Sequence, residues 1–367
     1  MKKRILLLIS DDPNYDQRMQ KICTSLATNN YDVLLVGIAR TKKVKPLITQ
    51  PFRQRRLNVI SKTGFFLFAE INMRLFFSLL FTSFDIVCAI DLDTIMPAYF
   101  LSILKRKERV YDAHELFCEM PSIASRSHIH KFWKGIERFF LPRFKNGYTV
   151  NNSISEEYFK MYGLHYEVIM NVAVLKQEDY SNIEKDKKLL LYQGLIQKGR
   201  GIEYFIHAMK SINARLVICG RGDYFDEAKG LTSELMLQDK ISFKGYVFPK
   251  ELKEITQQAY IGLNTTTGEG KSYYLSLSNR TFDYMHADTP QVAMNFPEYA
   301  AINKEFEIAI LIDELTTENI VSATNRLLSD EILYHRLKQN CEKAKLKYNW
   351  QNEEKKLIAF YDTLFRD

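Results

Sequence analysis

The chain of 367 residues has few cysteines, few prolines and only two tryptophans. Its cysteines are Cys23, Cys88, Cys118, Cys219 and Cys341, and no two of them form a CxxC pair. An odd number of scattered cysteines excludes a disulfide framework and a zinc site of the usual spacing. We therefore expect the protein to work in a reducing compartment.

Long apolar runs are also absent. Residues 5–9 are apolar, but Asp11 and Asp12 follow closely, so the run predicts a first buried strand rather than a secretion signal. The longest apolar stretch, residues 65–84, contains a Glu, an Asn and an Arg, which makes it a poor membrane span. These absences favour a cytoplasmic protein.

The loop after the first predicted strand, SDDPNYDQ, has no GxGxxG motif. The best sequence evidence for a dinucleotide-binding oxidoreductase is therefore missing. The chain does have the length for two domains of about 170 residues each. Its composition, with 46% hydrophobic and 26% charged residues, is that of a soluble globular protein.

Positive charge is concentrated near the N-terminus. Residues 1–60 hold twelve Lys and Arg against four Asp, whereas the whole chain has a net charge of +7. A basic N-terminal face fits phosphate-rich substrates, anionic lipid or nucleic acid, and a merely solvated surface explains it equally well. No recognised nucleic-acid-binding motif accompanies it, so we expect no nucleic-acid partner.

The first half alternates predicted strands and helices. A strand over residues 3–9, a helix over 18–28 and a strand over 32–38 form a β-α-β opening, which favours a parallel sheet. Residues 40–62 are basic and are expected to be irregular. A later helix over residues 153–162 is expected to be capped by Asn152 or Ser153.

The segment 40–68 combines a basic loop with Phe65, Phe66 and Phe68. Basic residues followed by aromatics are typical of a membrane-surface contact. The apolar residues that follow recur at helical spacing, so a core helix covering the sheet explains the aromatics equally well.

Polar residues of the first half cluster where predicted strands end. They are Asp16 and Arg18 after the first strand, Asp91 and Asp93 after residues 85–90, and Asp112, His114 and Glu115 in the run YDAHE. Ligands bind at the carboxyl ends of parallel strands, so most of these residues are candidates for substrate contact. We interpret Asp91 and Asp93 simply as the end of a strand. No HxxxH or HExxH spacing marks His114 as a metal ligand.

The second half repeats the pattern after a polar linker at residues 177–188. The strand LLLYQG leads into the glycine-rich run LIQKGRG and then a helix. A strand, a glycine-rich loop and a helix N-terminus together form a natural diphosphate cradle. Gly194, Gly199 and Gly201 permit close backbone approach, and Arg200 supplies positive charge.

The run YYLSLSNRTFDYMHADTP, residues 273–290, predicts a helix that ends before Pro290 and is capped by Ser276 or Ser278. Asn279, Asp283 and His286 fall on one polar stripe of this helix, opposite an apolar stripe. Arg280 lies near its N-terminus, where a cation and free N–H groups suit a phosphorylated sugar. An ordinary surface helix has the same residue types.

Part of this run, NRTFDYMHADTP, resembles the signature of the family 4 retaining glycosyltransferases, which have the two-domain GT-B fold. Arg280 takes the basic position, Asp283 the acidic one and Pro290 the last. The resemblance implies that Asp283 holds the ribose of a nucleotide and that Arg280 faces its diphosphate. The run YDAHE resembles the place from which a His of this family reaches the donor sugar, which implies that role for His114.

Three positions depart from the family pattern. The second acidic residue of the signature is Leu275 here, with Glu269 as a conceivable substitute. An Arg found after the first glycine of the loop in many family members is Leu195. The cradle therefore has one cation fewer, and the acidic position filled by Asp283 has a shorter arm than the usual Glu.

The resemblance implies substrate contacts for further residues. The diphosphate would be bound by Arg200, Gly194, Gly199 and Gly201, and the nucleobase by Gly245 and Val247. The acceptor side would be contacted by Asp16 and Arg18. The remaining substrate groups would be contacted by Asp112, Glu115, Glu269 and Asn279. Cations and helix N-termini would neutralise the leaving diphosphate, so no cofactor and no metal is expected.

The expected fold is therefore α/β, with two Rossmann-like doubly wound parallel sheets. We expect an acceptor-side domain at 1–172, a donor domain at 173–345 and a helix at 346–367 that crosses back to the first domain. The expected partners are a nucleotide-sugar donor, a glycan or lipid-linked acceptor, and the inner face of the plasma membrane through residues 40–68. The expected role is retaining transfer in bacterial surface polysaccharide synthesis. A nucleotide-sugar epimerase and a non-catalytic scaffold on the same fold are the alternatives.

Overall fold

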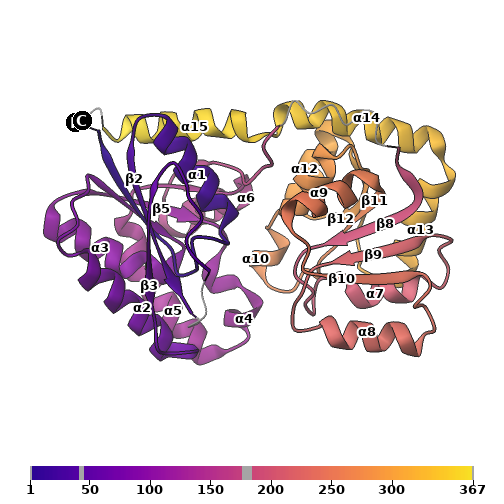
Figure 1. Cartoon of the computed structure of the whole chain (residues 1–367), viewed down its shortest axis with the longest axis horizontal. Coiled ribbons are helices and arrows are strands. Elements are labelled where there is room, and N and C mark those ends of the chain that lie inside the picture. Colours follow the sequence, from indigo (N-terminus) through magenta and orange to yellow (C-terminus); the bar gives the residue numbers. More distant parts are fainter. Residues whose placement is uncertain (1, 41–44, 176–183, 366–367) are drawn as a thin grey trace. The chain divides into compact units, whose positions relative to one another are not determined.

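The computed structural model describes residues 2–40, 45–175 and 184–365 (Figure 1). The chain divides into two compact units: unit 1 comprises Met1–Asn171 and Glu353–Asp367, and unit 2 comprises Val172–Asn352. Each unit contains one parallel sheet covered by helices, so the predicted pair of doubly wound sheets is confirmed. Part of the polar segment 177–188, which we expected to link the domains, lies outside the described residues.

The sheet of unit 1 has the strand order β3-β2-β1-β4-β5-β6-β7, with every pair parallel. Its central strand β1 is buried along Ile5–Leu8, as expected of a strand covered by helices on both faces. The strands are β1 (Arg4–Leu8), β2 (Asp32–Ala39), β3 (Arg53–Asn58), β4 (Ile86–Ile90), β5 (Glu108–Ala113), β6 (Asn146–Thr149) and β7 (Glu167–Val168).

Strand β3 corrects the expectation that residues 40–62 are irregular. The strand, RQRRLN, lies at the edge of the sheet and pairs only with β2. Its side chains are exposed or half-buried, and Arg53 pairs with Asp32 at 2.9 Å. An edge strand with exposed side chains needs no alternation of apolar and polar residues. Its sequence therefore has no strand pattern, which is why the strand was not predicted.

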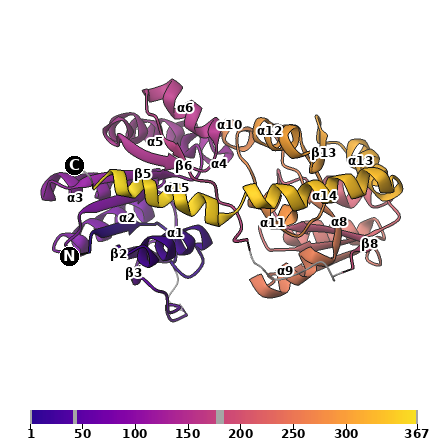
Figure 2. The same cartoon turned by 90° about the horizontal axis from the view of Figure 1, so that it is seen from above.

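The helices of unit 1 cover both faces of this sheet. They are α1 (Gln17–Thr28), α2 (Gly64–Leu79), α3 (Ile95–Lys105), α4 (Pro121–Ala124), α5 (Ser127–Phe140), α6 (Asn152–Tyr162) and the part of α15 (Trp350–Thr363) that starts at Glu353. Figure 2 shows α15, in yellow, lying over the elements of unit 1. Glu353 accepts a hydrogen bond from the Met170 N–H at 2.8 Å, and Tyr361 is fully buried.

The cap of α6 lies one residue earlier than expected. Asn151, in extended conformation, accepts a hydrogen bond from the Ile154 N–H at 2.9 Å, so neither Asn152 nor Ser153 is the N-cap. Because β6 ends at Thr149, the chain turns directly from strand into helix, and the residue with extended backbone takes the capping position.

The sheet of unit 2 has the order β10-β9-β8-β11-β12-β13, again all parallel. Its strands are β8 (Asp186–Gln193), β9 (Arg215–Cys219), β10 (Ile241–Gly245), β11 (Ala259–Asn264), β12 (Gln291–Met294) and β13 (Ala309–Ile312). Its helices are α7 (Ile202–Ala208), α8 (Phe225–Glu234), α9 (Pro249–Gln258), α10 (Lys271–Tyr274), α11 (Asn279–His286), α12 (Pro297–Phe306), α13 (Thr317–Ser329) and α14 (Glu331–Lys347).

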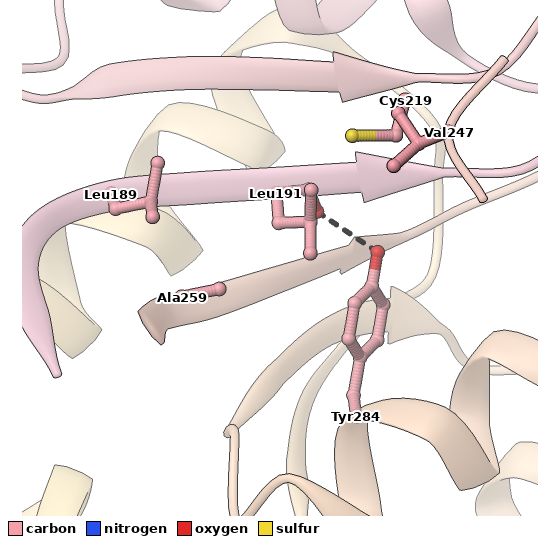
Figure 3. Packing of buried hydrophobic residues seen from close by; sticks show 6 residues of the cluster. All are labelled: Leu189, Leu191, Cys219, Val247, Ala259 and Tyr284. Carbon is pink, nitrogen blue, oxygen red and sulfur yellow. Dashed lines mark hydrogen bonds between the residues drawn. The ribbon is translucent and has the colours of Figure 1, made fainter. Parts of the chain in front are cut away.

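Helix α11 is fixed to the unit 2 sheet through Tyr284. The ring packs with a core cluster from β8, β9, β11 and the segment after β10, and its hydroxyl donates to the Leu191 carbonyl at 2.9 Å (Figure 3). Gly262 on β11 leaves room for this ring, since a Cβ there would lie 2.4 Å from it. Core packing therefore fixes where the rest of α11 points its polar side chains.

Two further observations concern the described residues as a set. All five cysteines are free and buried. Within residues 2–40, 45–175 and 184–365, none of the helices combines the length and the apolar character that crossing a membrane would require.

Candidate functional site

Both sheets have the strand order in which the connection reverses direction beside the first strand. In unit 1 this switch point lies between β1 and β4, and in unit 2 it lies between β8 and β11. Parallel α/β sheets bind ligands outside the carboxyl ends of the strands at such points. The candidate residues of each unit are therefore described at these two edges, one unit at a time.

At the unit 1 edge, Asp112 holds two cations. Arg18 Nη2 lies 3.0 Å from Asp112 Oδ1, and His114 Nε2 lies 3.2 Å from Asp112 Oδ2. Arg18 also donates to the Ile169 carbonyl at 3.0 Å. Asp112 is fully buried and Arg18 is 4% exposed. Both side chains lie inside the unit, where Asp112 contacts the His114 ring and Arg18 contacts Asp112; the predicted substrate contact of either residue stays a prediction.

Asp91 is the residue at this edge that sequence reasoning missed. It follows β4 with a left-handed backbone, at φ 56°, and its Oδ1 accepts a hydrogen bond from the His114 N–H at 2.8 Å. Its Oδ2 lies 3.6 Å from His114 Nδ1, so both ring nitrogens of the histidine face a carboxylate. The sequence did contain a signal for this role. Asp91 directly follows a buried strand, and its position is level with the DAHE run on the neighbouring strand.

The charges at this edge favour an imidazolium. Burial by itself lowers the pKa of His114, but the carboxylates of Asp112 and Asp91 outweigh burial and raise this pKa to about 9. Burial works to raise the pKa of Asp112, yet Arg18 and His114 bring it below its ordinary value. Burial raises the pKa of Asp93 to about 6. His114 is therefore a cation at neutral pH and has no free ring nitrogen to act as a base.

The other two unit 1 candidates lie beside this cluster in the chain. Asp16 is the N-cap of α1, and its Oδ1 accepts a hydrogen bond from the Met19 N–H at 2.9 Å. Glu115 is half-buried, and its carbonyl accepts a hydrogen bond from the Tyr158 hydroxyl at 3.3 Å. A substrate contact by either side chain stays a prediction.

At the unit 2 edge, the glycine-rich loop is tied to the segment after β11. The Thr267 N–H donates to the Gly199 carbonyl at 2.7 Å, and the Thr266 hydroxyl donates to the same oxygen at 3.0 Å. Gly201 has φ 82°, and a Cβ there would lie 2.4 Å from Thr265 Oγ1. The loop must therefore be glycine at this point, and its path is fixed before any ligand binds.

Arg280 is buried in this edge with no counter-ion. It is 7% exposed, its Nε donates to Ser278 Oγ at 3.0 Å, and its guanidinium lies 4.6 Å from the Tyr192 ring centroid. Among the described residues, Nη1 has no hydrogen-bond partner and the guanidinium has no carboxylate neighbour. A Cβ added to Gly194 would lie 4.0 Å from Nη1, so this unpaired donor faces the glycine-rich loop.

The use of Ser278 corrects the expected helix cap. Ser278 occupies the N-cap position of α11, but its hydroxyl accepts from Arg280 and makes no capping hydrogen bond. Ser276 donates instead to the Tyr273 carbonyl at 2.9 Å. The first turn of α11 therefore has no side-chain cap, and its N-terminus keeps its positive character for a ligand.

Arg200, like Arg280, packs on a tyrosine ring of unit 2. Its guanidinium is 4.6 Å from the Tyr273 ring centroid. Both guanidiniums act on Tyr299, whose pKa is raised by burial and partly lowered by the two arginines. Two cations from separate segments of unit 2 thus act on one tyrosine, and their joint binding of a diphosphate stays a prediction.

Asp283 is positioned by Gln193, a second residue that sequence reasoning missed. Gln193 donates from Nε2 to Asp283 Oδ2 at 2.8 Å and accepts from the Thr256 hydroxyl at 2.7 Å. Gln193 is 3% exposed and directly follows the buried run LLLY at the end of strand β8. A buried amide at a strand end was the signal for this role. Asp283 is half-buried, on the predicted polar stripe with Asn279 and His286.

The remaining unit 2 candidates are distributed along the same edge. Gly245 has φ 66° and Val247 is buried in the core cluster, while Glu269 and Asn279 are exposed. Of the positions that depart from the family pattern, Leu195 is 52% exposed and Leu275 is buried. In the part of the chain that the structure describes, no group of three or more His, Cys, Asp or Glu is arranged to hold a metal ion.

Comparison with known proteins agrees with this geometry. Residues 175–344 match the family model described as glycosyl transferases group 1. A curated relative, the uncharacterized glycosyltransferase MJ1607 of Methanocaldococcus jannaschii, is 29% identical over 184 residues, which are 49% of this chain. The aligned segment spans about half of that relative, 46% of its length.

Solved structures resemble the whole chain. Sucrose-phosphate synthase from Thermosynechococcus elongatus has a TM-score of 0.81 at 18% identity, with 99% of each chain covered. WaaG, a glycosyltransferase involved in lipopolysaccharide biosynthesis, has a TM-score of 0.76 at 15% identity, covering 99% of this chain and 100% of its own. Anabaena HepE in complex with UDP-glucose has a TM-score of 0.74 at 12% identity, covering 98% and 99%. Residues 175–344 thus match the glycosyl transferases group 1 family, and the whole chain has the two-domain GT-B fold.

Proposed function

We propose that the chain is a glycosyltransferase that moves a sugar from a nucleotide-diphosphate donor to a hydroxyl group, with retention of anomeric configuration. The observation that carries the proposal is Arg280, a buried cation without a counter-ion that faces the glycine-rich loop. Removing a cation from water without a partner is costly, so a site of this kind is expected to receive an anion.

The roles follow from the contacts at each edge. Arg280 and Arg200 neutralise the charge that develops on the leaving diphosphate, a preorganised electrostatic role that needs no metal. Asp283, held by Gln193, accepts hydrogen bonds from the ribose hydroxyls. His114, held as an imidazolium by Asp91 and Asp112, contacts the donor sugar. The remaining candidates at the two edges line the substrates.

The neighbours suggest which donor to try first. The HepE structures contain UDP, UDP with glucose, and UDP-glucose, and a TarM structure also contains UDP. WaaG is involved in lipopolysaccharide biosynthesis. We infer a UDP-type donor, a glycan or lipid-linked acceptor and a place in bacterial surface polysaccharide synthesis, at the cytoplasmic face of the membrane. Residues 41–44, part of the segment 40–68 expected to contact that membrane, lie outside the described residues.

Calorimetric titration with UDP, GDP, CMP and ADP, first without metal and then with magnesium, tests the donor site. We expect one diphosphate to bind without metal. The double variant Arg200→Ala/Asp283→Ala should lose at least about tenfold in affinity, since it removes one charged contact on each side of the nucleotide. Lys210→Ala/Asp239→Ala, which removes the same charges from exposed positions of unit 2, is the matched control.

Two results would count against the proposal. Unchanged affinity in the folded double variant would remove Arg200 and Asp283 from the site. Tight nucleotide binding without sugar transfer to any acceptor would favour a scaffold, which the exposed Leu195 and buried Leu275 at two pattern positions would explain. NMR of the anomeric proton of the product decides between retention and inversion.

A further inference from the structure

The last two residues of strand β8 contact the two charged candidates of helix α11. Gln193 donates to Asp283, and Tyr192, the residue before it, packs against Arg280. Tyr192 is fully buried, and its ring also lies 5.7 Å from that of Phe205 on α7. Core packing alone would be satisfied by a phenylalanine at this position, so the contacts that need a tyrosine are the informative ones.

The Tyr192 ring holds the Arg280 guanidinium without neutralising it. The guanidinium carbon lies 4.6 Å from the ring centroid, within the range of a cation–π contact. The hydrogen bonds of the guanidinium go to neutral oxygens, since Nε donates to Ser278 Oγ at 3.0 Å and Nη2 to the Thr265 carbonyl at 3.4 Å. A carboxylate in place of the ring would cancel the positive charge, whereas an aromatic face leaves it available to an anion.

The Tyr192 hydroxyl fixes the glycine-rich loop. It donates to the Leu195 carbonyl at 2.8 Å, and because Tyr192 is fully buried, this carbonyl oxygen points into the unit. The preceding carbonyl, that of Gly194, packs against Gly220, where an added Cβ would lie 1.8 Å from its oxygen. Carbonyl oxygens accept hydrogen bonds and donate none, so directing them inward keeps them from facing the oxygens of a phosphate.

Two other buried tyrosines act on Arg280 but hold different backbone segments. Burial works to lower the pKa of Arg280, and Tyr192 together with Tyr284 and Tyr299 raises it above its ordinary value. The Tyr284 hydroxyl donates to the backbone of β8, and the Tyr299 hydroxyl accepts from the N–H at the N-cap of α11. Tyr192 differs from both because its hydroxyl bonds the glycine-rich loop.

We propose that Tyr192 is the positioning residue of the diphosphate site. Its ring places Arg280 with its charge intact, and its hydroxyl holds the loop with the Leu195 carbonyl turned away from the ligand. One side chain thereby fixes the cation and the loop relative to each other before a diphosphate binds, which lowers the ordering cost of binding. The inference rests on the proposed function and adds to it a residue outside the runs LIQKGRG and NRTFDYMHADTP.

The test is calorimetric titration of the full chain with UDP and with inorganic pyrophosphate, both without metal. Tyr192→Phe removes the hydroxyl and keeps the ring, and it should bind both ligands roughly fivefold more weakly. Tyr192→Leu removes both groups and should bind both roughly 50-fold more weakly. Because pyrophosphate has no ribose, equal losses for the two ligands assign the effect to the diphosphate. Gln193→Leu should instead lose more affinity for UDP than for pyrophosphate.

A double-mutant cycle with Arg280→Met separates the ring contact from core packing. If the ring acts through the guanidinium, Tyr192→Leu should cost no more than Tyr192→Phe once Arg280 is replaced. A difference of roughly tenfold that persists beside Arg280→Met would mean that the ring only packs the core.

A spectroscopic readout needs no ligand. The NMR signal of the Arg280 Nε–H group is assigned by its loss in Arg280→Met. A ring stacked on the guanidinium shifts this signal, so the shift should persist in Tyr192→Phe and disappear in Tyr192→Leu. An unchanged signal in folded Tyr192→Leu would contradict the ring contact. Tyr192→Phe retains the packing on Phe205, so the test of the hydroxyl does not depend on whether the leucine variant folds.

Matched controls come from Tyr260, a buried tyrosine near the start of the neighbouring strand β11, whose ring stacks on Tyr334 with centroids 3.7 Å apart. Tyr260→Phe and Tyr260→Leu should bind both ligands like the parent chain, and losses equal to those of the Tyr192 variants would overturn the proposal. If the parent binds both ligands and Tyr192→Phe binds them equally well, the positioning role fails while the proposed function stands. A parent chain that binds neither ligand would remove both.

Discussion

The carboxyl edges of the two sheets have the same topology but treat charge in opposite ways. In unit 1, Asp112 lies between Arg18 and His114, and Asp91 faces the other side of the imidazole. In unit 2, Arg280 is buried to a similar extent as Arg18, but none of the described residues places a carboxylate beside its guanidinium. One edge neutralises its own charges and the other leaves a cation unpaired.

The difference indicates what each edge is built to meet. A self-neutralised cluster is stable without ligand and suits the uncharged hydroxyls of a sugar or acceptor. An unpaired buried cation is unfavourable until an anion arrives, so it suits a diphosphate. Opposite changes in stability should therefore follow when the arginine of each edge is removed.

The largest effect is expected from Arg18→Met. Removing one partner of a buried ion pair leaves Asp112 uncompensated, which typically costs about 3–5 kcal/mol. Hydrogen exchange of the β5 and β6 peptides should show this loss, and peptides from β8 and β11 should exchange as before. Unaltered protection of β5 would mean that the pair in unit 1 contributes no more than an exposed one.

In unit 2, Arg280→Met should weaken diphosphate binding without lowering stability. Diphosphate affinity should fall roughly 100-fold, since charge-assisted contacts to phosphate are lost. The free energy of opening of β8 and β11 should stay the same or rise, because a buried cation without counter-ion disappears. A marked loss of stability without nucleotide would show that Arg280 is mainly structural, and the contrast between the edges would fail.

A pH series on His114→Gln gives the smallest of the three effects. The folded pKa of His114 is about 9, above its ordinary value near 6.5, so its charge stabilises unit 1 fully below pH 6.5 and loses this effect as pH rises through 9. Protection of β5 in the parent chain should exceed that in His114→Gln by about 1–3 kcal/mol at pH 6.5.

This difference should shrink by pH 10. Asp91→Asn is the control, because it removes one of the two carboxylates and should lower the midpoint of the change. Asp93, with a pKa of about 6, titrates below this range, whereas burial raises the pKa of Asp91 to about 8, so part of the change between pH 6.5 and 10 belongs to Asp91 and is absent from Asp91→Asn. A difference that is constant from pH 6.5 to 10 would mean that His114 is neutral in the folded chain.

Repeated local patterns made much of the fold predictable. Buried parallel strands such as Ile5–Leu8 read as apolar runs, and the stripe of Asn279, Asp283 and His286 follows from helical spacing alone. Strand β3 left no such pattern, because an edge strand with exposed arginines needs no apolar face. Apolar residues recur at a regular spacing where one face of a helix or strand is buried. A strand with little buried surface therefore shows no such pattern in its sequence.

The candidate site was predictable in its residue types but not in its pairings. Arg200, Arg280 and Asp283 were named from the glycine-rich loop and the helix signature. The roles of Asp91 and Gln193 depend on side chains that meet across 23 and 90 residues of sequence, which only the packed sheets bring together. Ser276 or Ser278 was expected to cap the helix, but the Ser278 hydroxyl accepts a hydrogen bond from Arg280 and the Ser276 hydroxyl donates to the Tyr273 carbonyl.

The division of unit 1 between the two ends of the sequence also affects how the protein is made. Tyr361 on α15 is fully buried against Tyr148 of β6, with their hydroxyls 3.4 Å apart, and Glu353 accepts from the Met170 N–H. The ribosome must translate all of Val172–Asn352 before it reaches these residues, which takes roughly 10–40 s at bacterial rates. During that interval the first 171 residues lack the helix that completes their core, whereas unit 2, being continuous, can finish folding first. This protein's newly made chains are therefore most in need of chaperone protection at their N-terminal half.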